Sequence, residues 1–173
     1  LALLPEHVQA SMFDVDLNGA HVLDLTPDNL QLSANRTKPS EAQLDAVMAE
    51  ALAQNDVVLG RYGEARLIYG GEAFGQTDHV ARRRRTVHIG IDVFLPPETP
   101  VCAVFPGVVI SAEYRANRHD YGGTLILEHD CPDGTTFRAL YGHLSRASAE
   151  EKQVGQRFAA GEVIAHLGDI DEN

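Results

Sequence analysis

Residues 82–101, RRRRTVHIGIDVFLPPETPV, place a histidine and an aspartate four positions apart within a run of β-branched residues. Such a run is typical of a β-strand. In an extended strand His88, Gly90 and Asp92 share one face, because successive side chains alternate. The opposite face is apolar, and we expect its four residues to be buried: Val87, Ile89, Ile91 and Val93. The polar face is left to contact a ligand or solvent.

Gly90 is a candidate hinge between the two polar residues. Four residues of flat strand separate the origins of the His88 and Asp92 side chains by about 13 Å, too far for one ion to contact both. Glycine allows a strand to bend, so we predict a bend at Gly90. Imidazole nitrogens and carboxylate oxygens bind zinc, and three protein ligands with one open position make a catalytic site. The residue types also fit a histidine at a sheet edge beside a solvated aspartate.

Short strand-like runs separated by Gly, Pro, Asp and Asn fill the chain from residue 57 onward. The runs are RLIYG, TVHIGIDVF, PVCAVFPGVVISAEY, GGTLILEHD, TFRALYGHLS and EVIAHLG. Their regular spacing indicates an all-β sandwich or barrel. We therefore expect a mainly β fold, with one β domain over residues 57–173.

Residues 1–56 have a different pattern and are expected to form an N-terminal leader. Asn18-Gly19 is typical of a hairpin turn, here between residues 12–17 and residues 20–25. Ser40 and Gln43 fit a capping box, and apolar residues then recur at helical spacing to about Gln54. The leader is therefore predicted to hold a hairpin and one short amphipathic helix.

Composition excludes some classes of partner. Fourteen basic and twenty-five acidic residues give a net charge of −11, so we expect no nucleic-acid partner. No export signal or long apolar stretch is visible, so we expect a cytoplasmic chain with no membrane partner. The two cysteines, Cys102 and Cys131, are too few for a disulfide framework and fit a reducing compartment.

A third polar group emerges at the end of another predicted strand, in YGHLS at residues 141–145. His143 could act as a general base toward metal-activated water or stabilise the oxyanion that forms on attack. Tyr141 is two residues away, so strand alternation places it on the same side as His143. For Tyr141, lining a groove and packing in the core both remain open.

Five segments occur in order between about residues 86 and 168: HIGID, ETPVCAVFPGVV, YGGTLILEH, LYGHLS and VGQRFAAGEVIAHLG. In order and approximate spacing they resemble the lysostaphin-type, LytM-like zinc metallopeptidases, metallopeptidase family twenty-three. The resemblance implies a compact antiparallel β-sandwich or barrel-sandwich hybrid with a groove for a peptide. It implies zinc as the cofactor, His88 and Asp92 as zinc ligands, and His143 as the catalytic histidine. The implied reaction is hydrolysis of an amide bond in a peptide or other amide substrate.

The sequence differs from the family pattern at the third zinc ligand. In the family this ligand comes from a final His-x-His segment, which we expect beyond Asn173. His166 falls where the family has a small or apolar residue, and we interpret it as a strand histidine. With two ligands we expect weak zinc affinity and no peptidase activity for residues 1–173.

Two further resemblances concern the flanking domains and the alternative function. The leader, together with RRRRTVHIGIDVF, looks like the peptidase-like middle region of bacterial fusion proteins that join a phosphotransferase domain to a pyridoxal-phosphate-dependent class III aminotransferase domain. That context implies flanking domains in the same polypeptide, whereas a fragment of an exported peptidase would be periplasmic or extracellular. The halves of biotinyl and lipoyl carrier domains are also similar, but neither Lys38 nor Lys152 lies on a predicted hairpin tip. A noncatalytic binding or scaffolding domain of the same fold is the alternative function.

Overall fold

The structure is a computed structural model that describes residues 9–29, 40–66, 87–116 and 120–172. The chain forms two compact units. We call residues 16–95 the continuous unit, and residues 1–15 with 96–173 the discontinuous unit. Among the helices of the described residues, none has the length and apolar character needed to span a membrane.

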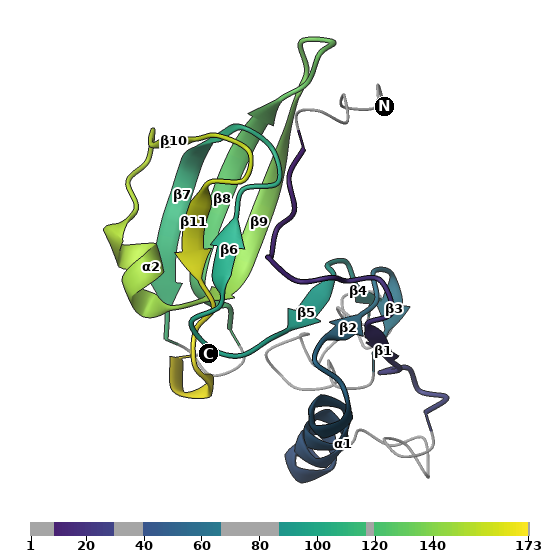
Figure 1. Cartoon of the computed structure of the whole chain (residues 1–173). Coiled ribbons are helices and arrows are strands. Elements are labelled where there is room, and N and C mark those ends of the chain that lie inside the picture. The colour runs from purple at the N-terminus through teal and green to yellow at the C-terminus, as the bar shows by residue number, and fades with distance from the viewer. Residues whose placement is uncertain (1–8, 30–39, 67–86, 117–119, 173) are drawn as a thin grey trace, which may run out of the picture. The chain divides into compact units, whose positions relative to one another are not determined.

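A four-stranded antiparallel sheet forms the main layer of the discontinuous unit, in the order β10-β7-β8-β9 (Figure 1). Its strands are β7 (Gly107–Arg115), β8 (Gly122–Asp130), β9 (Thr136–Leu144) and the short β10 (Arg157–Phe158). β8 and β9 are joined by the CPDG turn, in which Gly134 has a φ of 82°. A positive φ is accessible to glycine at low cost, so this glycine suits the turn.

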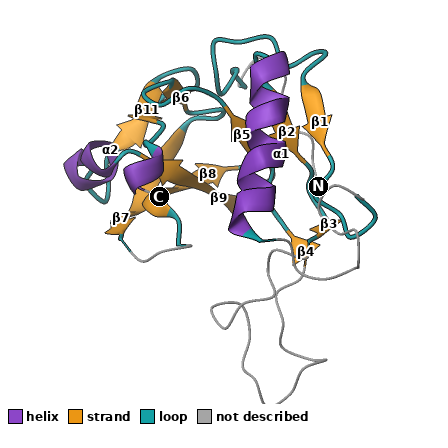
Figure 2. Ribbon diagram, turned by 90° about the horizontal axis from the view of Figure 1, so that it is seen from below, coloured by secondary structure: helices purple, strands orange, loops and turns teal. Residues whose placement is uncertain are grey.

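A second, two-stranded antiparallel sheet lies over the main sheet and consists of β6 (Pro100–Cys102) and β11 (Val163–His166) (Figures 1 and 2). Apolar side chains of both layers are fully buried, namely Val101, Val109, Leu125, Leu127, Leu144 and Ile164. α2 (Arg146–Glu151) follows β9, and η4 (Ile170–Glu172) is a 3-10 turn. Residues 9–15 join this unit through backbone hydrogen bonds from Ala10 N–H to the Val104 carbonyl and from Cys102 N–H to the Met12 carbonyl, both 2.8 Å.

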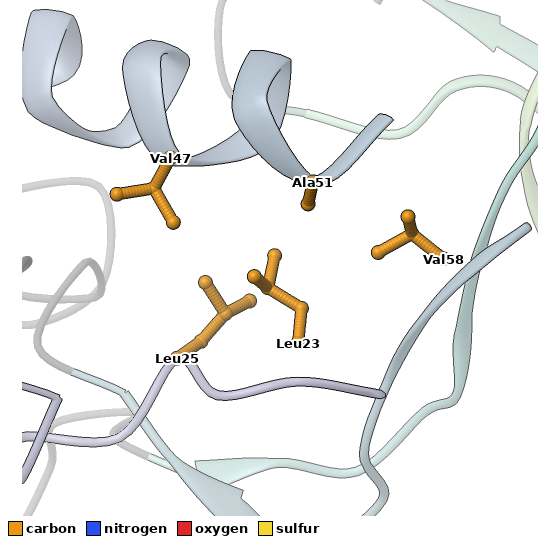
Figure 3. Packing of buried hydrophobic residues seen from close by; sticks show 5 residues of the cluster. All are labelled: Leu23, Leu25, Val47, Ala51 and Val58. Atoms are coloured by element: carbon orange, nitrogen blue, oxygen red, sulfur yellow. The ribbon is translucent and has the colours of Figure 1, made fainter. Parts of the chain in front are cut away.

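The continuous unit packs one helix on a small sheet. Its strands β1 (His21–Leu23), β2 (Val58–Gly60) and β5 (Asp92–Phe94) lie in the order β1-β2-β5, and α1 (Glu41–Gln54) crosses them (Figure 2). Val47 and Ala51 point from α1 toward the buried side chains of Leu23, Leu25 and Val58 (Figure 3). Removing this apolar surface from water holds the helix on the sheet.

A separate two-stranded ladder in the continuous unit pairs β3 (Glu64–Ala65) with β4 (Val87–His88). Because β4 pairs with β3 while β5 pairs with β2, the run predicted as one strand over residues 86–94 is divided between two sheets. The division falls at residues 89–91, where the backbone bends at Gly90.

The mainly β, antiparallel fold class is confirmed, and α1 begins with the predicted capping box. The predicted hairpin in the leader is wrong. The turn at Asn18-Gly19 exists, but β1 pairs in parallel with β2 instead of with residues 12–17, which form no strand. α2 was not predicted. Residues 57–95 lie in the same unit as α1, and the predicted domain boundary after residue 56 stays a prediction.

Candidate metal centre

His88 and Asp92, the two predicted zinc ligands, are brought together by the bend at Gly90. His88 ends β4, where it pairs with Glu64, and Asp92 begins β5, where it pairs with Gly60. The distance from His88 Nε2 to Asp92 Oδ1 is 3.4 Å, instead of the span of a flat strand. Both side chains are partly buried, with 17% and 24% of their surface exposed.

This separation fits a zinc ion. Two ligand atoms at about 2.0–2.2 Å from a tetrahedral zinc lie about 3.3–3.6 Å apart. The Nε2–Oδ1 distance of 3.4 Å falls within that range. The two atoms are also of the kinds that zinc prefers, an imidazole nitrogen and a carboxylate oxygen. His88 and Asp92 would therefore hold one edge of a zinc site.

The remaining polar atoms of both side chains have partners in the segment 61–66, which contains β3 and the turn before it. His88 Nδ1 lies 3.3 Å from the Arg61 carbonyl oxygen, and Arg66 Nη2 donates to Asp92 Oδ2 at 2.7 Å. Partners of this type orient metal-binding histidines and carboxylates. Nε2 and Oδ1 are thereby directed toward each other.

Two glycines make room for this arrangement. A Cβ at Gly60 would lie 2.4 Å from Asp92 Oδ2 and 2.8 Å from Arg66 Nη2. A Cβ at Gly90 would lie 3.0 Å from His88 Nε2. Any larger residue at Gly60 must therefore move the Asp92 carboxylate or the Arg66 guanidinium.

The expected burial of the opposite face is wrong for three of its four residues. Val87, Ile89 and Ile91 are 47%, 78% and 69% exposed. The strand break explains the difference for the two isoleucines, because both lie between β4 and β5 instead of on the face of a continuous sheet. Val93, in β5, is partly buried.

His143, the predicted catalytic histidine, lies in the discontinuous unit near the end of β9. Its side chain is exposed and its φ is 56°, an uncommon conformation for a residue other than glycine. The backbone is held by hydrogen bonds from His143 N–H to the Tyr121 carbonyl (2.8 Å) and from Gly168 N–H to the His143 carbonyl (3.0 Å). The Tyr121 ring lies beside the His143 ring, with centroids 5.9 Å apart.

Tyr141 packs in the core and is only 7% exposed. The expectation that it shares a side with His143 is wrong, because β9 carries an extra residue at this point. Leu125 is opposite Tyr141 and Gly123 is opposite Leu144, so two residues of β9 face the single residue between them. Tyr141 and Leu144 are therefore both buried, while His143 is exposed.

The other described histidines have structural or surface positions. His129 is 1% exposed, its Nδ1 lies 2.9 Å from the Pro106 carbonyl oxygen, and its ring stacks on Phe137 with centroids 4.8 Å apart. His166 is a partly buried residue of β11, and His21 is an exposed residue of β1. His7, His79 and His119 lie outside the described residues.

Sequence reasoning missed Glu64 and Arg66, both of which are buried and charged. The available signal was the pair of opposite charges two positions apart, which share one face of a strand. Charged residues are seldom fully buried unless they are paired, so such a pair is compatible with burial. Within the described ranges, no group of three or more His, Cys, Asp or Glu side chains could hold a metal ion.

Comparison with known proteins connects this geometry to a family. The model of peptidase family M23 matches residues 86–173, which include both His88 and Asp92 and extend over His143. No curated protein matches. A solved structure described as the NMR solution structure of lysostaphin is similar, with 28% identity and a TM-score of 0.38. The match covers 48% of this chain and 31% of the lysostaphin chain, so this chain spans about a third of that protein's length.

Proposed function

The chain belongs to peptidase family M23, and from this premise we propose that it is a zinc-dependent peptidase domain that hydrolyses an amide bond. The fold is the LytM-like β fold of that family, and the family implies a peptide substrate. The observation that carries the proposal is the pair of His88 Nε2 and Asp92 Oδ1 at 3.4 Å, the separation of two ligands on one zinc ion.

His88 and Asp92 would hold the ion, and their partners in the segment 61–66 would keep both side chains oriented without the metal. Zinc, when bound, would supply Lewis-acid activation of water and of the amide carbonyl. We assign to His143 the role of general base or oxyanion stabiliser. Its exposed imidazole on a backbone fixed by two hydrogen bonds supports this role, since a catalytic base needs a defined position.

The test of the metal site is zinc affinity, measured by competition with a chromophoric chelator over a wide range of zinc concentration. His88→Ala and Asp92→Asn should each weaken binding by more than about 100-fold, because losing an outer partner of a ligand alone costs about 10–100-fold. His21→Ala is the matched control, since His21 is an exposed histidine of the same unit. Equal affinity in His88→Ala and the parent protein would contradict the proposal.

Hydrolysis is tested with fluorescence-quenched peptides and with bacterial cell-wall fragments. Any cleavage by the parent chain should be abolished in His143→Asn, whose zinc affinity should stay unchanged, since asparagine tolerates the left-handed backbone of this position. The described residues contain two candidate ligands instead of a group of three, which favours a second function, a noncatalytic peptide-binding domain of the same fold. Zinc and peptide binding without cleavage would support that second function.

A further inference from the structure

We infer that Arg66 is the positioning residue for Asp92: its guanidinium holds the Asp92 side chain in the χ1 rotamer that turns Oδ1 toward His88. This inference rests on the proposed zinc site. It concerns a residue that lies outside the 86–173 segment matched by the family model and is brought to Asp92 by the fold.

Arg66 contacts two carboxylates with different nitrogens. Nη2 donates to Asp92 Oδ2 at 2.7 Å, and Nε donates to Glu64 Oε2 at 2.9 Å. The side chains of Arg66 and Glu64 are only 4% and 1% exposed. A planar guanidinium held at a second point can direct a carboxylate in a way that a single ammonium nitrogen cannot.

Glu64 is in turn anchored to the rest of the continuous unit. Its Oε1 accepts hydrogen bonds from Leu25 N–H and from Arg61 Nε, both at 3.2 Å. Arg61 also forms an ion pair with Asp24 at 2.9 Å. The contacts therefore run from the end of β1 through Glu64 and Arg66 to Asp92, so that the folded unit sets the position of the carboxylate.

Two opposing effects of Arg66 on zinc affinity can be separated. Its positive charge repels a zinc ion, and this effect alone predicts tighter zinc binding when Arg66 is removed. The adjacent Glu64 carboxylate largely cancels that charge, because the two groups form a buried pair at 2.9 Å. The orientation of Asp92 should therefore affect zinc affinity more than the charge of Arg66 does. Removing Arg66 together with its pairing charge should weaken zinc binding by about 10–100-fold, as for other outer partners of metal ligands.

The main test variant is the double substitution Glu64→Gln with Arg66→Met. Removing Arg66 alone would leave the Glu64 carboxylate buried next to fewer cations, which destabilises a fold. The glutamine keeps an oxygen for Leu25 N–H, and the methionine fills space without charge. Arg115→Met with Glu113→Gln is the matched control, because it removes an exposed arginine–glutamate pair of the discontinuous unit.

Gly60→Ala tests the same arrangement with every charge retained. Its Cβ would lie 2.4 Å from Asp92 Oδ2, so the carboxylate or the guanidinium must shift. The φ of Gly60 lies outside the left-handed region, so alanine introduces no backbone strain there. Arg66→Lys retains the charge but offers one nitrogen in place of the two guanidinium nitrogens that bind Asp92 and Glu64. Its zinc affinity should therefore lie between those of the parent and the double variant.

The first readout needs no metal. Three-bond NMR couplings of the metal-free protein report the χ1 rotamers of Asp92. We expect one rotamer in the parent and the control, averaged rotamers in the double variant, and a changed or averaged rotamer in Gly60→Ala. A single unchanged Asp92 rotamer in the double variant would overturn the inference.

The second readout is the zinc dissociation constant, together with the visible spectrum of the cobalt-substituted protein and the midpoint of chemical unfolding. We expect a 10–100-fold weaker affinity and a changed cobalt spectrum in a double variant whose unfolding midpoint stays near that of the parent. Unchanged or tighter zinc binding, or full restoration by Arg66→Lys, would overturn the inference. A parent that binds no zinc would instead refute the proposed function, and the Asp92 rotamers would still decide the role of Arg66.

Discussion

At the scale of single residues, the geometry of the candidate site depends partly on neighbours in the sequence and partly on residues that the fold brings close. The spacing of His88 and Asp92 and the glycine between them are local features, so the bend and the approach of these two side chains could be predicted from sequence. The roles of Glu64 and Arg66 could not, because they depend on β3 pairing with β4 and β2 pairing with β5. Such pairings join segments that are distant in sequence, and no short motif specifies them.

Tyr141 provides a test of burial at the scale of one side chain. Burial raises the pKa of its phenol above the ordinary value of 10.0, while a backbone hydrogen bond from Val104 acts in the opposite direction. The unfolded chain therefore ionises first as the pH rises. The contribution of Tyr141 to stability is fully present below about pH 10 and is lost above it.

We expect Tyr141→Phe to lose less stability than the parent protein in alkaline solution. Above about pH 10 the difference in unfolding free energy should move in favour of the variant by up to about 1.4 kcal/mol per pH unit. Urea unfolding at a series of alkaline pH values measures this difference. Tyr62→Phe, at a tyrosine that is 68% exposed, is the control, and parallel pH curves for Tyr141→Phe and the parent would contradict the prediction.

Among the elements, the helix was predictable and the leader hairpin was not. α1 has its start signal and its apolar spacing within its own sequence, so local rules suffice. The Asn18-Gly19 turn forms, but a turn does not determine what the following strand pairs with. β1 gains a parallel partner, β2, and buries Leu23 against α1, and this packing outweighs the local hairpin preference.

The cap of α1 gives the element-scale prediction. The Ser40 side chain accepts a hydrogen bond from Gln43 N–H at 3.2 Å, and the Gln43 side chain accepts one from Ser40 N–H at 2.9 Å. Ser40→Ala should lower the unfolding free energy by about 1 kcal/mol, within a range of about 0.5–2 kcal/mol. Urea unfolding measures the loss. Ser40→Asp retains a capping oxygen and should stay near the parent, so an equal loss in both variants would refute the cap.

On the scale of the whole molecule, the two units differ in whether they are built from one segment of the chain or from two. The continuous unit uses residues 16–95 only, whereas the discontinuous unit needs Ala10 to meet Val104 and β6 to meet β11. Contacts between distant segments require more loop closure before they form. The regular strand spacing predicted the β fold, but the division into units follows from pairings that the spacing does not specify.

We therefore expect the continuous unit to become protected first when the full chain refolds. Pulsed hydrogen exchange with mass spectrometry should show early protection of β1, β2 and β5, followed by later protection of β6 and β11. The amides of β1, β2 and β5 and those of β6 and β11 all belong to short strands, so each set is the control for the protection time of the other. Simultaneous protection, or earlier protection of β6 and β11, would contradict this order.

The backbone hydrogen bonds that join Ala10 and Met12 to Val104 and Cys102 also matter while the chain is being synthesised on the ribosome. Synthesis proceeds from the amino terminus, so the acceptor carbonyl of Val104 is made only after all of residues 16–95. Once residue 95 has left the ribosome, the β1-β2-β5 sheet can be completed, yet Ala10 and Met12 obtain their backbone partners, Val104 and Cys102, only from chain that emerges later. Until residues 102–104 emerge, these hydrogen bonds cannot form, so we expect the Phe13 side chain, which is buried in the folded protein, to stay exposed on the nascent chain.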